Sequence, residues 1–320
     1  MFDSRESGCC NALAPGVAYA RSSQRSRDFI GGTTLMQVDW SALGAKSPTA
    51  LVKARTLAHH AMQWIVKAAL ANSASGPDAA QATLVWDRER GAFFTQALTS
   101  GGAEVRVGLR LGRLALILLR AHLVLDEYEV SGRRDSMVGV WLDSALRALG
   151  LKPAGGITLP YTIPSHQVAR GSPYALSGEL ESFDELARWF GAAADLLEQV
   201  TTDCANEHAQ LGAVICSPHH FDMTTLIAID DALQAGSRSV RIGFSAGDHY
   251  FQQPYVFVSP TPHPPATALP ALPAPGHWHT QGLFAAVITG EQIVALPDAR
   301  AGALNFVRGV YDFAHGRAAA

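Results

Sequence analysis

The stretch Ser217-Pro218-His219-His220-Phe221-Asp222-Met223 stands at the entry to a run of predicted strands and defines the architecture of the second half of the chain. It opens a region with five of the twelve histidines, namely His219, His220, His249, His277 and His279. Short apolar runs between turn residues predict strands at 213–216, 223–229, 239–244, 255–259 and 282–288, interrupted by a Pro-rich loop over 260–275. Helical periodicity over 183–200 and 303–315 places a helix on either side of them.

The first half of the chain shows the same order of elements. Helical spacing predicts helices over 49–72, opened by Ser47-Pro48, and over 138–149, ended by Gly150. Between them, runs at 82–86, 92–98, 105–111 and 114–119 predict four strands, and their short connections require antiparallel pairing. An extended, proline-containing segment over 155–173 joins the halves.

These patterns predict an α+β fold with two antiparallel-sheet-plus-helix halves, residues 37–155 and 156–320. Their common order of elements indicates a pseudo-duplicated arrangement. Residues 1–36 have no apolar periodicity and are predicted to form a flexible tail, with folded sequence beginning near Met36.

Composition excludes several classes of function. A net charge of -3 gives no basic footprint for nucleic acid, and the apolar run Leu114–Leu119 is far too short to cross a membrane. The four cysteines lack zinc-type spacing, and Cys216 is interpreted as a small buried apolar residue. We therefore expect a cytoplasmic protein that binds or turns over a small molecule rather than a nucleic acid.

The histidine-rich region predicts two kinds of chemistry. On an extended backbone His220 and Asp222 share one face, as do His277 and His279 around Trp278. With His249, these five side chains could hold a divalent metal ion, because imidazole and carboxylate groups are common metal ligands. Without a metal, His220 could form a general acid–base pair with Asp222 or Asp248.

Other interpretations of the same region stay open. A serine nucleophile would be Ser217 or Ser245, yet neither lies in a Gly-x-Ser-x-Gly elbow. Aromatic residues near the histidines could instead line a pocket for a non-catalytic ligand, and the loop 260–275 could dock a partner protein. His59, His60 and Gln63 on the first helix are interpreted as surface or core-edge polar groups. The sequence does not decide between an enzyme and a binding protein.

Six short motifs occur in a recognisable order: residues 57–63 (LAHHAMQ), 147–151 (RALGL), 159–164 (LPYTIP), 217–222 (SPHHFD), 243–248 (GFSAGD) and 254–258 (PYVFV). In this order they resemble the uncharacterised bacterial DUF5996 family, over most of the chain after Met36. The longer insertion that usually precedes the Phe-Asp pair in that family is absent before Phe221. Because the family has no assigned activity, the resemblance implies an architecture and no reaction.

Overall fold

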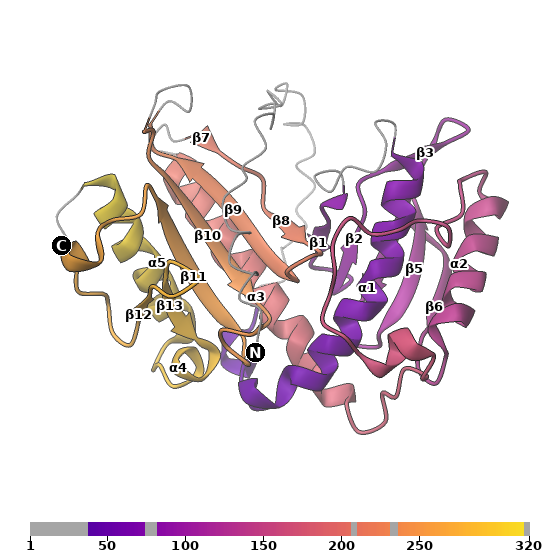
Figure 1. The fold of residues 1–320 in the computed structure, drawn as a ribbon, viewed down its shortest axis with the longest axis horizontal. Helices are drawn as coiled ribbons and strands as arrows, with labels where there is room; N and C mark the ends of the chain where they lie inside the picture. Colours follow the sequence, from indigo (N-terminus) through magenta and orange to yellow (C-terminus); the bar gives the residue numbers. More distant parts are fainter. Residues whose placement is uncertain (1–37, 74–81, 206–209, 231–235, 317–320) are drawn as a thin grey trace, which may run out of the picture. The chain divides into compact units, whose positions relative to one another are not determined.

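The computed structural model describes residues 38–73, 82–205, 210–230 and 236–316 (Figure 1). The predicted tail and Met36 lie outside these described residues. From Val38 onward the chain forms one compact unit. It contains two antiparallel sheets with helices, which confirms the predicted α+β fold with two sheet halves.

The first sheet has six strands in the order β1-β2-β4-β5-β6, with β3 paired to β4. Their bounds are β1 Val85–Asp87, β2 Ala92–Phe94, β3 Leu98–Ser100, β4 Ala103–Arg110, β5 Ala115–Arg120 and β6 Leu123–Glu129. The predicted strand 92–98 is therefore two strands, both paired to β4. At the break, the Thr95 hydroxyl accepts a hydrogen bond from the backbone N–H of Val107, so a side chain replaces a ladder partner.

The second sheet has seven strands in the order β12-β13-β11-β10-β9-β7, with β8 paired to β9. Their bounds are β7 Gln210–Leu211, β8 Ile215–Ser217, β9 Asp222–Ala228, β10 Ser239–Ser245, β11 Tyr255–Thr261, β12 His277–His279 and β13 Ala285–Thr289. The loop predicted over 260–275 begins within β11. Strands β7 and β12, like β6 in the first sheet, were not predicted.

Five α-helices lie within the described residues: α1 Val52–Asn72, α2 Asp135–Ala148, α3 Leu180–Ala205, α4 Gly290–Val294 and α5 Ala299–His315. Helix α1 continues from a short 3-10 helix, Pro48–Leu51, and the Ser47 side chain does not cap it as the sequence predicted. Gly150 does end α2, because its φ of +72° is left-handed and its N–H donates to the carbonyl of Arg147 at 2.9 Å.

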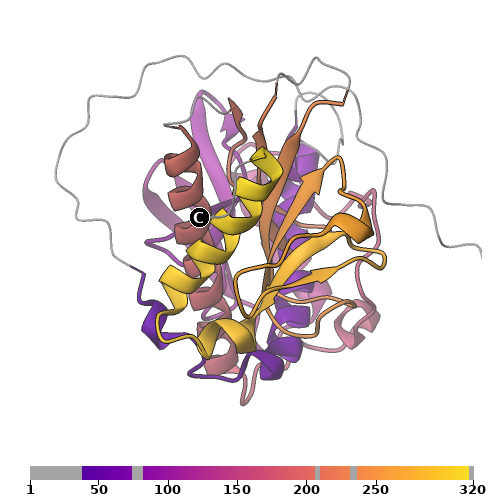
Figure 2. The same ribbon diagram turned by 90° about the vertical axis from the view of Figure 1, so that its left-hand side faces the viewer.

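The helices are divided between the two sheets. Helix α1 contacts the first sheet and α2, whereas α3 and α5 cover one face of the second sheet (Figure 2). Residues such as Met223, Ile242 and Phe244 point to that covered face and join the main core. Side chains alternate along a strand, so their neighbours in sequence point to the opposite face, here called the outer face of the second sheet.

Within the part of the chain that the structure describes, a backbone bridge joins the two sheets. The N–H of Leu84, just before β1, donates to the carbonyl of Cys216 on β8 at 3.0 Å, and the N–H of Cys216 donates back at 2.8 Å. Cys216 is buried, as predicted for a small apolar residue, and burial raises the pKa of its thiol. No helix within the described residues is long and apolar enough to cross a membrane.

Candidate functional site

A tight turn, residues 218–221, joins β8 to β9 and presents the histidine pair. Ser217 and Asp222 are directly paired, and the N–H of Phe221 donates to the carbonyl of Ser217 at 2.9 Å. Phe221 has a φ of +55° and its ring is buried in the core. The extended backbone expected over this segment is therefore wrong, because His219 and His220 stand exposed on the turn.

Helix α1 holds this turn in place. The Nε2 of His59 lies 2.8 Å from the carbonyl oxygen of Pro218, and the Gln63 amide donates to the same oxygen at 3.3 Å. The His59 ring also stacks on Phe221, with ring centroids 5.4 Å apart. Burial lowers the pKa of His59 to about 4, so its neutral imidazole donates to Pro218 at neutral pH.

The other polar groups of α1 hold the segment over 155–173. His60 Nε2 lies 2.8 Å from the carbonyl oxygen of Pro164, and the Tyr161 hydroxyl donates to Gln63 Oε1 at 2.9 Å. His59, His60 and Gln63 are all buried, so of the two predicted positions, the surface and the core edge, the structure favours the core edge. Their hydrogen bonds give them a structural role.

A row of polar side chains crosses the outer face of the second sheet. The strand register places five residues directly opposite one another on consecutive strands. This polar row consists of Ser217 on β8, Asp222 on β9, Ser245 on β10, Tyr255 on β11 and Thr289 on β13. Directly opposed residues in antiparallel strands have Cβ atoms about 5 Å apart. The row therefore places a carboxyl group and four hydroxyl groups on one face of the sheet, where Ser245 and Tyr255 are buried.

Asp222 is the unusual member of the polar row. Asp222 as a whole is partly exposed to solvent. Its Oδ1 atom, however, is buried and has no hydrogen-bond partner among the described residues. Burial raises its pKa to about 7, the nearby Asp248 adds to the rise, and Arg241 opposes it. At neutral pH the carboxyl group is thus divided between its acid and its carboxylate forms.

Asp248, by contrast, is fully engaged by the loop between β10 and β11. One oxygen accepts the N–H groups of Tyr250 and Phe251 at 2.8 and 3.1 Å. The other accepts the hydroxyl of Tyr255 at 2.6 Å, and burial together with this carboxylate raises the pKa of Tyr255. We assign Asp248 to positioning this loop and Tyr255, because all these donors restrain it.

Arg55 supports the same loop from α1 and was missed in the sequence. Its guanidinium lies against Gly247, whose φ of +109° favours glycine, and its Nη1 is buried without a hydrogen-bond partner among the described residues. Burial lowers the pKa of Arg55, and the charge of Asp248 opposes this change. The sequence could have pointed to Arg55, because it lies four residues before His59 and the two therefore share one face of α1.

His220 lies near Asp222 but is not hydrogen-bonded to it in the described part of the chain. Its ring is 4.3 Å from that of His219. Burial lowers its pKa; the charges of His219, Arg241 and His249 lower it further, and Asp248 raises it. The charges of Arg241 and Asp248 thus affect the pKa of both Asp222 and His220. The direct acid–base pair predicted between these two residues does not form in this structure.

Two of the remaining predicted ligands, His277 and His279, lie beside Phe251, and the third, His249, lies beside Tyr250. His277 and His279 lie on one face of β12, as expected, with ring centroids 5.9 and 5.4 Å from Phe251. His249 packs on Tyr250 at 3.8 Å. Among residues 38–73, 82–205, 210–230 and 236–316, no three His, Cys, Asp or Glu side chains are grouped so as to hold a metal ion. The five-residue metal site gains no support.

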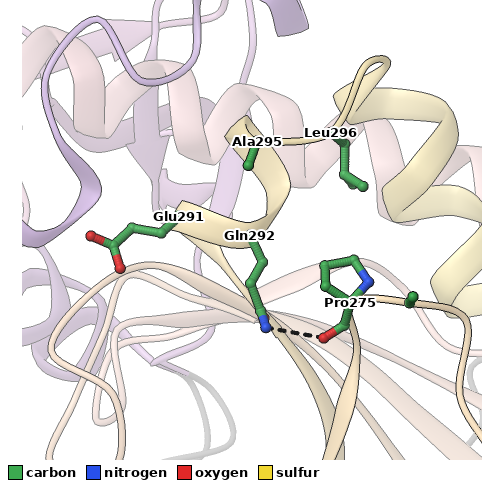
Figure 3. Close-up of a pocket in the computed structure, with 6 residues that line it drawn as sticks. Pro275, Glu291, Gln292, Ala295 and Leu296 are labelled. Carbon is green, nitrogen blue, oxygen red and sulfur yellow. Dashed lines mark hydrogen bonds between the residues drawn. The ribbon is translucent and has the colours of Figure 1, made fainter.

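A pocket lies beside α4 (Figure 3), and one of its lining residues, Gln292, is hydrogen-bonded to Thr289 at the end of the polar row. It is lined by Ala274, Pro275, Glu291, Gln292, Ala295 and Leu296 and includes none of the predicted histidines. The Gln292 amide already donates to the carbonyl of Pro275 at 3.0 Å, and the Glu291 carboxylate points away from it. Chemistry therefore favours the outer face of the second sheet as the candidate site.

No family model, curated protein or solved structure matches this chain. The candidate site therefore rests on its own geometry.

Proposed function

We propose that the polar row binds a small molecule and turns it over by acid–base chemistry, with Asp222 as the group that gives and takes the proton. The observation that carries this proposal is a carboxyl group on the outer face with a pKa near 7 and no hydrogen-bond partner for its buried oxygen among the described residues. A proton-transfer group works best when its pKa lies close to the working pH. Perturbed carboxyl groups of this kind are concentrated at functional sites.

The neighbouring residues support separate roles. Ser245 and Tyr255 follow Asp222 in the polar row, but both are buried and already hydrogen-bonded, Ser245 to the N–H of Gly247 and Tyr255 to Asp248, so they position the site rather than contact a substrate. Arg241 lies on the same face of β10, four residues before Ser245, or about 13 Å along the strand. Its exposed guanidinium favours a substrate with negative charge. His220, on the turn beside them, could relay a proton to solvent.

Metabolite profiling tests this proposal because it follows many candidate substrates at once. Purified protein is incubated with a metabolite extract at pH 6, 7 and 8, and compounds that change are compared between the wild type and Asp222→Asn. We expect at least one compound to be consumed only by the wild type, with a rate that depends on pH near 7. If every change persists in Asp222→Asn, the assignment of Asp222 is wrong.

A non-catalytic ligand-binding protein is the alternative at the same site. It would show thermal stabilisation by a metabolite, because a ligand that binds only the folded state raises the free energy of unfolding, and no compound would be consumed. The variants Asp222→Asn and Ser245→Ala should both reduce that stabilisation. Stabilisation that is unaffected by either change would place the ligand elsewhere.

Membership of the DUF5996 family and a cytoplasmic location also belong to this proposal. The first is supported by the ordered motifs given above and the second by the spacing of the four cysteines. Neither the family resemblance nor the location indicates which reaction the polar row would catalyse.

A further inference from the structure

Two groups of rings involve the turn before Asp222 and the loop after Ser245. In the first, Tyr161 stacks on His219 at 4.7 Å, and His219 lies 4.3 Å from His220. In the second, His249 packs on Tyr250 at 3.8 Å, and Tyr250 lies 5.3 Å from His279. Each group therefore has a histidine, His220 or His249, that is solvent-exposed and supported by a further ring.

The two exposed histidines stand at the same end of the paired strands β9 and β10, because His220 precedes Asp222, His249 follows Ser245, and Asp222 and Ser245 are directly paired. The charge of His249 bears on His220, and the charges of Asp248 and Arg241 bear on both His220 and Asp222. Partial desolvation of its ring on the turn lowers the pKa of His220, which favours the uncharged imidazole at neutral pH. An uncharged imidazole ring can hold a ligand by stacking and by hydrogen bonds.

We propose that His220 and His249 take a flat heteroaromatic molecule with an acidic group, its ring near Asp222 and its acidic group toward Arg241. This inference names a substrate class for the proposed function and rests on it. The ring faces supply the stacking surface, the protonated carboxyl group of Asp222 donates to a ring nitrogen, and the exposed guanidinium of Arg241 binds the acid. A puckered ring of the same charge would lose the stacking contribution.

Three small probes separate these contributions by NMR-detected binding. Benzoate and cyclohexanecarboxylate have the same charge and differ in flatness, whereas nicotinate adds a ring nitrogen to benzoate. We expect benzoate to bind at least about fivefold more tightly than cyclohexanecarboxylate, a factor within the range of an aromatic pair. Nicotinate should bind more tightly than benzoate at pH 6, where Asp222 is mainly protonated.

Ring-removing and ring-keeping variants test the location. His220→Leu and His249→Leu should each weaken benzoate binding about fivefold, and His220→Phe should retain it, because Phe keeps an aromatic face. The control His122→Leu removes an exposed histidine at the turn between β5 and β6 and should bind like the wild type. All three sites are exposed, so loss of the fold would not explain a difference.

The outcomes distinguish this inference from the proposed function. Equal binding of benzoate and cyclohexanecarboxylate, no binding of either aromatic acid, or wild-type binding in both His→Leu variants would overturn the flat-ring class. Asp222→Val should keep benzoate binding and lose the preference for nicotinate, because valine has no hydrogen-bond donor, whereas Asp222→Asn should keep the preference through its amide N–H. If the preference survives in Asp222→Val, the role of Asp222 as a hydrogen-bond donor fails while the ring-binding role of His220 and His249 stands.

Discussion

Replacement of Asp222 by Asn should stabilise the protein relative to the wild type, by an amount that grows as the pH rises from about 4 to about 7. In this window the folded carboxyl group retains a proton that the unfolded chain has released, because burial raises its pKa to about 7 from an ordinary 3.8. The wild type therefore loses stability as the pH rises through this window. Asn has nearly the same shape, carries no charge and lacks this loss.

The structure sets an upper limit for the effect. A difference of one pH unit in pKa corresponds to about 1.4 kcal/mol, so the change from 3.8 to about 7 amounts to about 4 kcal/mol when complete. Between pH 5 and pH 8 the free energy of unfolding of Asp222→Asn, relative to the wild type, should rise by up to about 3 kcal/mol. Above that range the difference should be constant.

Urea unfolding of both proteins at half-unit pH intervals measures this difference. Asp230→Asn provides the control: hydrogen bonds from Arg238 lower the pKa of Asp230 to about 2, so it stays ionised in both states throughout this range. Its stability difference from the wild type should not change between pH 5 and pH 8. A constant difference for Asp222→Asn as well would refute the reasoning, since the carboxyl group would then have an ordinary pKa.

Three further changes are expected to affect stability. Because burial lowers the pKa of His59 to about 4 from 6.5, the wild type should gain stability as the pH rises between these values, and His59→Gln should lack this gain in urea unfolding. Gly247→Ala should lower the free energy of unfolding by about 2–3 kcal/mol, because the φ of Gly247 is left-handed and the added carbon would overlap the guanidinium of Arg55. The control Gly91→Ala, at a left-handed glycine with open space around it, should lower it by about 1 kcal/mol. Thermal unfolding measures both. Tyr255→Phe removes a donor to Asp248 and should cost about 1–3 kcal/mol, with faster amide exchange in the loop between β10 and β11. Wild-type stability in any of these variants would contradict the corresponding contact.

The sequence predicted the four longer helices and most of the long strands because their buried faces repeat at helical or strand spacing, whereas the five-residue helix α4 is too short for such a repeat and was missed. Strand β6 was missed since it is exposed along most of its length and carries no alternating buried face. Strand β12 has only three residues and follows a proline-rich loop, so no periodicity could reveal it. In the interrupted strand over 92–98, the break at Thr95 depends on a side-chain hydrogen bond that spacing alone does not encode.

For the candidate site, the sequence singled out Asp222 and His220 but could not supply their partners. The row that joins Asp222 to Ser245 and Tyr255 depends on the register of three strands, and register follows from pairing across the sheet. The turn over 218–221 was unexpected because a left-handed Phe is uncommon, and here its buried ring and the contacts of α1 hold it. The raised pKa of Asp222 likewise arises from burial, which no motif records.

The bridge between Leu84 and Cys216 has a consequence for dividing the polypeptide into fragments. Separate expression of 37–155 and 156–320 would remove a hydrogen-bonding partner from each sheet and expose two matching backbone edges. Unpaired strand edges are templates for association. The two fragments should therefore aggregate when produced apart and complement each other when produced together, which would make this chain a candidate scaffold for a split reporter.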